Sequence, residues 1–420
     1  MKIIIFYEHL TREWNAIQGL KEIFEKKNCK VWTLSIIFER SKAKLIANIN
    51  KIDIIIVPWF VDKVHEEILY PIISTNPKIQ VINLHHEQIG SKESQHFLIP
   101  QSDYARNGVY HFAWGEYFKD LLIANGIDPN KVFVTGNIRN DESIERTTKT
   151  SKEELARIYQ LDITKKWILF AENRGWILQH NNEDTFKELI KRGGSREYLD
   201  NSVLYNKRSL DGFKSEISTM PHEFFDKYEF IYRPHPGTRL FDTLGKSVKI
   251  IADRSIYDWI NVCDIFLTCE STSIFEADMC GKPCFTVDWT DKYPDAIMNG
   301  VCDYPALNSI SELLQMTDEE ITKKCSLHMY ERYCGKVDGK SKNRVVAATY
   351  NIFKNGTAHI YPIAKLSIKG QIRQLIYEAI TWLFVKTTLI YKVHFPKSAY
   401  GESRDIPYAK ENRWIKEHTK

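Results

Sequence analysis

Short apolar runs rich in β-branched residues alternate with amphipathic segments along most of this chain. Strands of a parallel sheet are buried on both faces and read as continuous apolar runs, and the connecting helices supply the amphipathic segments. The alternation therefore predicts an α/β protein with parallel sheets. The expected strands of the first part are Lys2–Phe6, Lys30–Leu34, Ile52–Val57, Gln80–Leu84, His111–Trp114 and Lys131–Val134. Those of the second part are Trp167–Ala171, Glu229–Tyr232, Val248–Ile251, Asp264–Thr268 and Pro283–Val287.

A polar, charged stretch at residues 142–165 separates the two groups of strands, and we interpret it as a connection that contains one helix. Residues 180–225 are charged and poor in strand signals, which indicates an insertion of helices and loop. Doubly wound sheets present ligand groups at the carboxyl ends of their strands, so two of them in tandem predict a cleft between those ends. The expected domains are 1–145 and 166–345, with a connection at 146–165 and a helical tail at 346–420.

Composition excludes some classes of protein. The chain has 420 residues, of which 43% are hydrophobic and 27% charged, and its net charge is only +4. A nucleic-acid binder usually carries a pronounced basic stripe, so this balance argues against one. The eight cysteines form no CxxC pair, and we expect the cluster Cys263, Cys269, Cys280 and Cys284 to be buried reduced thiols. The first residues read as a strand, not as a secretory signal, so we expect a cytoplasmic protein.

The stretch Gly370–Lys392, GQIRQLIYEAITWLFVKTTLIYK, is helix-like and aromatic. Glu378 and Lys386 interrupt it, and its apolar part is shorter than the ~20 residues needed to span a bilayer. One interpretation is a helix packed back onto the domains. The other is a helix in the membrane interface at the inner face of the cytoplasmic membrane, which Trp382, Phe384 and the nearby lysines would suit.

The sequence YRPHPGT, residues 232–238, follows an expected strand directly. Proline lacks the backbone N–H and fixes φ, so neither a helix nor a central strand continues through this motif. The motif therefore predicts a stiff loop that holds Arg233 and His235 at the end of a strand. A guanidinium forms bidentate pairs with phosphate and an imidazole donates one hydrogen bond, so the pair indicates a phosphate ligand. The alternative is a structural loop histidine.

The sequence DIFLTCESTSIFEADMCGKPCF, residues 264–285, reads as strand, hydroxyl-rich loop, short helix and strand. A helix N-terminus offers free N–H groups and a partial positive charge, and hydroxyls add donors, so the loop predicts a phosphate site. Its residues are Ser271, Thr272 and Ser273. The alternative is that they only cap the helix, although one hydroxyl is enough for that.

Glu276 has three interpretations. It follows Ser273 at the spacing of a capping box. It also suits a solvated position on the helix. The third interpretation is a hydrogen bond to a ribose diol, as acidic residues make in nucleotide-binding folds.

Polar loops follow three further expected strands. NLHHEQIG (83–90) places Glu87 at a strand end, where a carboxylate can act as general base or lie on the surface. VTGNIRND (134–141) contains Gly136, which allows close approach of a ligand to the backbone. FAENRGW (170–176) contains Asn173 and Arg174, which we expect opposite Glu87 across the cleft.

These motifs resemble those of GT-B glycosyltransferases. More narrowly, RPHP and CESTSIFEADMCGKP resemble bacterial surface-carbohydrate and capsule enzymes that carry an HP motif and a later Ser/Thr motif. Kdo transferases, bacterial polysialyltransferases and CDP-glycerol or CDP-ribitol polyol-phosphate transferases share that signature. Residues 111–141 are similar to the WG…GNPRFD-type segment of surface-carbohydrate biosynthesis proteins, except that Ile138 replaces the usual proline and Asn140 an apolar residue.

The resemblance implies the GT-B fold, two Rossmann-like domains that face across a cleft, with a C-terminal helical tail. It implies that His235 and the hydroxyls of 271–273 contact the donor's phosphate, that Glu276 binds ribose, and that Glu87 occupies the place of a catalytic carboxylate. Enzymes of this kind stabilise the leaving phosphate with helix dipoles and cationic side chains. We therefore expect transfer without a metal ion or other cofactor.

The resulting hypothesis is a glycosyltransferase of bacterial surface polysaccharide biosynthesis. Its donor would be a CMP-activated acidic sugar such as Kdo, sialic acid or another nonulosonic acid, with Arg174 on the donor's carboxylate. Its acceptor would be a glycan or lipid-linked glycan, and no nucleic acid is involved. Three alternatives stay open: a CDP-polyol phosphotransferase, a UDP-sugar 2-epimerase, and a non-catalytic subunit that binds a nucleotide sugar.

Overall fold

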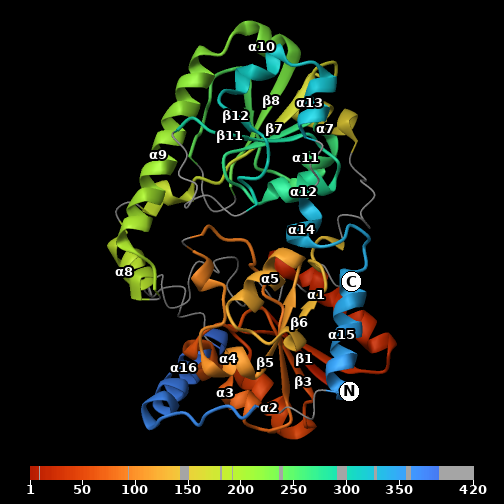
Figure 1. The fold of residues 1–420 in the computed structure, drawn as a ribbon, viewed down its shortest axis with the longest axis vertical. Helices are drawn as coiled ribbons and strands as arrows, with labels where there is room; N and C mark the ends of the chain where they lie inside the picture. Colours follow the sequence, from red (N-terminus) through yellow and green to blue (C-terminus); the bar gives the residue numbers. More distant parts are fainter. Residues whose placement is uncertain are drawn as a thin grey trace. The chain divides into compact units, whose positions relative to one another are not determined.

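A computed structural model describes residues 1–8, 10–92, 94–141, 151–179, 182–191, 193–235, 240–290, 300–325, 329–355 and 361–386 (Figure 1). The chain divides into two compact units. Unit 1 contains Met1–Gln88, Leu98–Glu142 and Asp338–Lys420, and unit 2 contains Ile89–Phe97 and Ser143–Val337. The prediction of a shared cleft between them stays a prediction.

Unit 1 is built on a six-stranded parallel sheet of order β2-β1-β3-β4-β5-β6. Its strands are β1 (Lys2–Tyr7), β2 (Lys30–Ser35), β3 (Ile54–Val57), β4 (Gln80–Asn83), β5 (Val109–Ala113) and β6 (Val132–Val134). Successive side chains of a strand point to opposite faces. Accordingly Ile3 and Ile5 of β1 belong to one hydrophobic cluster, while Ile4 and Phe6 belong to the other. The sheet therefore has a core on each face, as the apolar runs predict.

Helices cover both faces of this sheet. They are α1 (Leu10–Lys26), α2 (Arg40–Asn50), α3 (Lys63–Ile73), α4 (Asp103–Asn107), α5 (Glu116–Ala124), α15 (Ser341–Asn355) and α16 (Ile368–Lys386), with the 3₁₀ turn η2 (Pro129–Lys131). Residues of α1 and α15 share one cluster, and residues of α2 and α3 share the other. None of the helices in the described ranges is long and apolar enough to cross a membrane.

Unit 2 repeats the plan with sheet order β12-β11-β10-β7-β8-β9, and its paired strands are parallel. The strands are β7 (Lys166–Ala171), β8 (Tyr228–Arg233), β9 (Val248–Ile250), β10 (Ile265–Thr268), β11 (Cys284–Val287) and β12 (Ala306–Leu307). The predicted strands are confirmed within two residues of their bounds. Among the described residues β12 is the one additional strand, because two residues are too few to stand out as an apolar run.

The predicted connection holds α7 (Lys152–Tyr159), and the predicted insertion holds three helices. The helices of unit 2 are α7, α8 (Glu183–Lys191), α9 (Arg196–Thr219), α10 (His222–Lys227), α11 (Ile256–Val262), α12 (Ser273–Met279), α13 (Asp318–Lys324) and α14 (Tyr330–Cys334). The 3₁₀ turns are η1 (Gln95–Phe97), η3 (Gly175–Gln179) and η4 (Ile310–Gln315). Phe213 of α9 packs on Phe170 of β7 with ring centroids 5.0 Å apart, which seats the insertion on the sheet.

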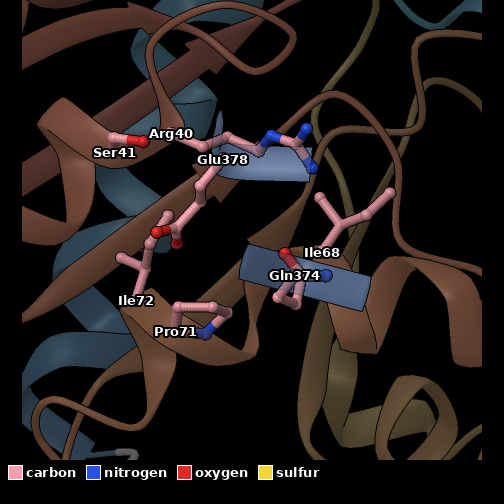
Figure 2. A pocket seen from close by; sticks show the side chains of 7 residues that line it. All are labelled: Arg40, Ser41, Ile68, Pro71, Ile72, Gln374 and Glu378. Carbon is pink, nitrogen blue, oxygen red and sulfur yellow. The ribbon is translucent and has the colours of Figure 1, made fainter. Parts of the chain in front are cut away.

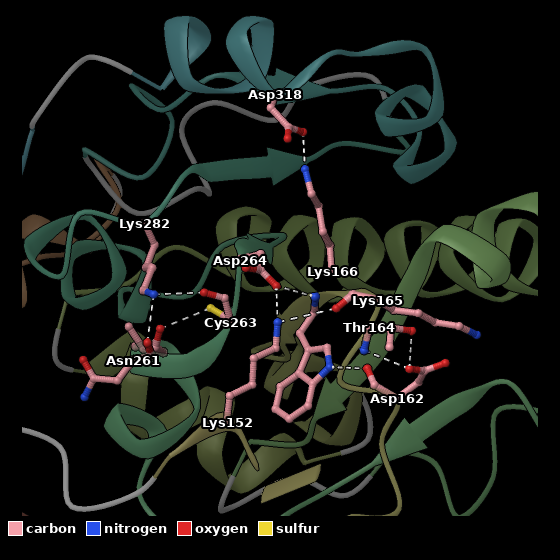
Figure 3. A network of polar contacts seen from close by, with 12 residues as sticks. Lys152, Asp162, Thr164, Lys165, Lys166, Asn261, Cys263, Asp264, Lys282 and Asp318 are labelled. Carbon is pink, nitrogen blue, oxygen red and sulfur yellow. Dashed lines mark hydrogen bonds and ion pairs between the residues drawn. The ribbon is translucent and has the colours of Figure 1, made fainter.

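A polar network fixes the amino-terminal edge of this sheet (Figure 3). The carboxylate of Asp264, just before β10, accepts hydrogen bonds from the main-chain N–H of Trp167 at 2.7 Å and from Lys152 Nζ at 2.8 Å. The Trp167 indole donates to the carbonyl of Asp162 at 2.9 Å. These contacts join α7 to the first strand of the unit, at the edge opposite the carboxyl ends.

The chain returns to unit 1 at Asp338, earlier than the predicted boundary at 345. The buried carboxylate of Asp141, after β6, accepts the main-chain N–H groups of Ser341 at 3.0 Å and Lys342 at 2.8 Å. It thereby satisfies donors at the start of α15 that have no partner inside the helix. This contact explains why α15 belongs with unit 1.

Gly136 serves the same junction. Its φ is +84°, and a Cβ there would lie 2.4 Å from Ser341 Oγ. The residue therefore allows the start of α15 to approach the backbone. The predicted role of Gly136 in ligand binding stays a prediction.

The eight cysteines are free thiols. Within the predicted cluster, Cys263, Cys269 and Cys284 are buried and Cys280 is half-buried. Burial raises the pKa of the Cys269 thiol to about 12. A thiol with so high a pKa is protonated at neutral pH and unreactive, as expected of a structural cysteine.

Candidate functional site

The candidate site of unit 2 lies where the strand order of its sheet reverses. The chain runs from β7 to β8 and β9 on one side, and continues as β10, β11 and β12 on the other. Ala171 pairs in register with both Arg233 and Thr268, so β7, β8 and β10 end at the same level. In open α/β sheets the crevice at such a reversal is where ligands bind. The loops after these strands are the predicted HP and Ser/Thr motifs and the segment FAENRGW.

The Ser/Thr loop forms a compact cluster of hydroxyls. Ser271 donates its main-chain N–H to Thr268 Oγ1 at 3.0 Å, and the Oγ atoms of Ser271 and Ser273 are 2.7 Å apart. Thr272 is the N-cap of α12, yet its side chain makes no capping hydrogen bond. The helix has only seven residues, and the predicted phosphate site at this loop stays a prediction.

Of the three interpretations of Glu276, the capping box does not agree with the structure. The helix begins at Ser273, which puts Phe275 and not Glu276 at the third helical position. The Glu276 carboxylate instead accepts a hydrogen bond from the Tyr257 hydroxyl of α11 at 3.3 Å. Its predicted contact with ribose stays a prediction.

The two polar residues of the HP loop behave differently. Arg233 donates through Nη1 to the carbonyl of Asp253 at 2.8 Å and through Nη2 to that of Arg254 at 2.5 Å. Its guanidinium thus holds the loop after β9, and the structure does not place it for the predicted bidentate phosphate contact. His235 is exposed, but the protein atoms around its ring lower its pKa by desolvation, while the charge of Glu172 acts in the opposite direction. Residues 236–238 of the motif lie outside the described residues.

A buried ion pair lies beneath this edge. Arg174 donates through Nε to Glu172 Oε1 at 2.8 Å and through Nη1 to the carbonyl of Ser209 at 3.0 Å, and its Nη2 bonds Glu172 Oε2. The Tyr232 hydroxyl donates to the same carboxylate at 2.7 Å. Burial favours the neutral acid, but the charge and hydrogen bonds of Arg174 outweigh it, so the pKa of Glu172 lies below its ordinary value.

The predicted contact of Arg174 with a donor carboxylate is not supported by this arrangement. The side chains of Arg174 and Glu172 are both 0% exposed. The guanidinium also lies over the ring of Phe213, 4.9 Å from its centroid. Because its guanidinium is already paired with the Glu172 carboxylate inside the protein, Arg174 is a residue that positions the loop after β7.

Asn173 and Glu270 connect the loops after β7 and β10. The Asn173 amide donates to the carbonyl of Glu270 at 3.4 Å. The Glu270 side chain is buried and accepts from Asn206 Nδ2 of α9 at 2.9 Å. Burial raises the pKa of Glu270 to about 7, with a further upward contribution from the charge of Glu172 and a downward one from the Asn206 hydrogen bond.

Unit 1 has a corresponding reversal of strand order between β1 and β3. Carboxylates and rings gather at the carboxyl ends of these strands. His86 Nδ1 lies 2.9 Å from Glu13 Oε1, with both side chains buried, and the Trp59 indole donates to Glu8 Oε2 at 2.7 Å. Glu87 comes next to this pair along the chain and is exposed.

The other histidine of this loop is structural. His85 Nε2 lies 2.8 Å from His111 Nδ1, and His111 Nε2 is 3.0 Å from the carbonyl of Ala105. Burial lowers the pKa of His111 to about 3, so the ring is neutral at physiological pH. His85 therefore packs the base of the loop and does not face a ligand.

Several residues of these edges could not be selected from the sequence. Glu172 follows β7 directly and Glu270 follows β10 after one residue, and these positions near a strand end were the one available signal. Tyr232 reads as an ordinary strand residue, and Glu13 reads as a residue of an amphipathic helix. Within the described ranges no group of three or more His, Cys, Asp and Glu side chains could hold a metal ion, and metal independence stays a prediction.

Comparison with known proteins identifies the fold. No protein-family model matches this chain, and no curated protein sequence matches it. Among solved structures it is similar to S. aureus MnaA in complex with UDP (14% identity, TM-score 0.53, 84% of this chain and 96% of that chain). The UDP-GlcNAc 2-epimerase from Neisseria meningitidis bound to UDP-GlcNAc also matches (16%, 0.51, 84% and 100%). So does the wall teichoic acid polymerase TagF (14%, 0.51, 85% and 90%). The chain has the GT-B fold. The predicted fold class is thereby confirmed, while identities this low establish the fold alone.

Replacing Glu270 with Gln tests the raised pKa of the buried Glu270 carboxyl through the pH dependence of stability. The folded protein keeps the Glu270 proton up to about pH 7, whereas the unfolded chain releases it near 4.5, so folding binds a proton between these values. Stability from this group is therefore complete below pH 4.5 and lost as pH rises to 7, by on the order of 3 kcal/mol.

Thermal unfolding between pH 4.5 and 8 measures this effect, with Glu197→Gln at an exposed position of α9 as the matched control. Relative to the parent and to the control, Glu270→Gln should gain stability as pH rises. Parallel profiles for all three proteins would show that Glu270 is ionised in the folded state.

Proposed function

We propose that this protein is a nucleotide-sugar-dependent glycosyltransferase of bacterial surface polysaccharide biosynthesis, and that unit 2 binds the donor. The observation that carries the proposal is the convergence of the HP loop and the Ser/Thr loop at the strand reversal of one sheet. There, His235 and the paired hydroxyls of Ser271 and Ser273 follow strands that end in register around β7. These side chains supply neutral donors, suited to a phosphate that gains negative charge as its bond to the sugar breaks.

The fold neighbours support the ligand class. The S. aureus and Neisseria meningitidis structures hold UDP and UDP-GlcNAc, and one TagF structure was soaked with CDPG. We extend the nucleotide part of these ligands to this chain. The choice of a CMP-activated acidic sugar comes from the sequence resemblance alone, because the guanidinium expected on its carboxylate is buried with Glu172.

In the proposed reaction, the bond between the anomeric carbon and the phosphate oxygen breaks, and its electron pair stays on the phosphate. The acceptor hydroxyl forms the new bond to that carbon and loses its proton to a base. We assign this base to Glu87, which is exposed after β4. The neighbouring His86 is buried with its Nδ1 2.9 Å from Glu13 Oε1, and its carbonyl accepts a hydrogen bond from Arg139 at 3.4 Å, so we assign it the role of positioning the Glu87 loop.

A UDP-sugar 2-epimerase is the second candidate function, favoured by the S. aureus and Neisseria meningitidis neighbours. It would use the same nucleotide site without an acceptor. The two functions differ in a simple observable, since an epimerase converts its nucleotide sugar when no acceptor is present.

Nucleotide binding in the absence of metal tests the proposal. We expect CMP, in EDTA-containing buffer, to raise the melting temperature of the protein, since a ligand at a hundred times its Kd adds about 2.7 kcal/mol. His235→Ala should weaken this effect about tenfold or more in apparent Kd, because a hydrogen bond to a charged group contributes about 1.5–3 kcal/mol. His222→Ala, an exposed histidine of α10, is the matched control.

CDP, UDP and GDP complete the panel. A preference for CDP would redirect the assignment to polyol-phosphate transfer, and a preference for UDP to the epimerase. A response that needs added metal would contradict the metal-independent site. No response to any nucleotide would refute donor binding by unit 2.

The assignment of the base predicts a split between binding and turnover. Glu87→Gln should lower kcat about 100-fold or more, as loss of a general base does, and leave nucleotide stabilisation unchanged. His86→Gln should lower kcat less. The measurement is the rate of nucleotide release from the donor that the panel selects. A greater loss in His86→Gln than in Glu87→Gln would make the imidazole, held by Glu13, the base.

A further inference from the structure

The helix α16 belongs to unit 1, and polar residues make its contacts with α2 and α3 described below. Gln374 is buried and donates to the carbonyl of Glu67 of α3 at 2.5 Å, and Arg373 Nη1 pairs with the Glu67 carboxylate at 2.8 Å. Glu378 Oε1 lies 3.5 Å from Lys44 Nζ of α2. Figure 2 shows Gln374 and Glu378 beside Arg40 and residues of α3, around a small pocket.

Four apolar residues in the first half of α16 are exposed. Ile368 is 78% exposed, Ile372 53%, Leu375 63% and Ile376 54%. Residues spaced in this way lie along one side of a helix. A surface helix of a globular protein normally buries its apolar side, whereas these four residues of α16 face outward. We call these four residues the α16 apolar row. Four large side chains exposed on a single helix differ from the singly scattered apolar residues that soluble proteins tolerate.

The same part of the chain is basic. Residues 361–420 contain eleven Lys and Arg against five Asp and Glu, a net charge of +6. The whole chain carries +4, so residues 1–360 carry −2. Lys365 and Lys369 flank the beginning of the apolar row in sequence. An anionic bilayer attracts such a segment, with about 1 kcal/mol for each Lys or Arg near its surface.

We propose that the α16 apolar row inserts into the interface of an anionic membrane, with the polar side of α16 fixed to α2 and α3. A basic helix with an apolar side lies in the plane of the bilayer at the level of the headgroups. This geometry agrees with the absence, among the described helices, of one able to span a membrane. The sequence beyond the apolar row offers Trp382 and Tyr391, residue types enriched at membrane interfaces.

Charge also favours a membrane over a second copy of the chain as the partner of the α16 apolar row. A symmetric contact through α16 would bring together two copies of residues 361–386, each with four Lys and Arg against one Glu, a net charge of +3. Like charges in proximity oppose such an association, whereas anionic lipid neutralises them. The proposal does not depend on the proposed function, since it concerns a surface of unit 1 and no nucleotide.

The test is co-sedimentation of the full chain with vesicles, using phosphatidylglycerol and phosphatidylcholine mixed or phosphatidylcholine alone. We expect binding to the anionic vesicles, weaker binding in high salt, and at least tenfold weaker partitioning to phosphatidylcholine. Ile372→Glu/Leu375→Glu should reduce partitioning to anionic vesicles at least tenfold. Leu204→Glu in α9, an apolar residue 44% exposed in unit 2, is the matched control and should bind as the parent does.

Each other outcome overturns the proposal. Salt-independent binding, or equal binding by the parent and the double variant, would mean that the α16 apolar row does not enter the bilayer. A dimer in light scattering that the double variant loses, without vesicle binding by the parent, would identify a second copy as the occupant. A monomer that binds neither vesicle would leave the row to a protein partner. Melting temperatures of both variants, measured without vesicles, establish that the substitutions leave the fold intact.

Discussion

The carboxyl edge of unit 2 depends on the buried ion pair between Glu172 and Arg174. The guanidinium forms a bidentate pair with the carboxylate. The carboxylate also accepts a hydrogen bond from the Tyr232 hydroxyl, and the guanidinium donates another to the Ser209 carbonyl. Breaking a buried pair by removing one partner costs about 3–5 kcal/mol, because the remaining charge stays desolvated. The pair joins the loop after β7 to β8 and α9, and so holds the surroundings of His235 and Asn173. A donor site on these loops therefore has a rigid base, which transition-state electrostatics requires.

Both units place polar side chains at a reversal of strand order, but the types of side chain differ between the two units. Each sheet reverses its strand order, at β7/β10 in unit 2 and at β1/β3 in unit 1, and each reversal collects polar side chains. Unit 2 offers hydroxyls and an imidazole, which suit a phosphate. Unit 1 offers carboxylates and His86, whose Nδ1 lies 2.9 Å from Glu13 Oε1. The proposed transfer assigns the phosphate to the groups of unit 2 and the activation of the acceptor hydroxyl to Glu87 of unit 1.

The fold could be predicted from the sequence because its strands are buried on both faces, which makes them continuous apolar runs. The roles of the site residues were harder to predict from the sequence, because the contacts of a side chain depend on the fold around it. From the sequence alone, Arg174 could not be distinguished from a ligand-binding arginine. The structure shows that its guanidinium is paired with the Glu172 carboxylate. Gly136 marks a close approach, but only the fold shows that the neighbour is Ser341. Glu276 does not form a capping box because the helix begins at Ser273, one residue earlier than that motif requires.

Hydrogen exchange of the chain with and without CMP tests the central claim, that unit 2 binds the donor nucleotide at its strand reversal. Amide exchange reports local opening, which a ligand suppresses where it binds. The account predicts slower exchange in peptides that contain 172–176 and 270–275, with peptides of the amino edge around Asp264 unchanged. Slower exchange confined to peptides of unit 1, or at the amino edge of unit 2 alone, would contradict it.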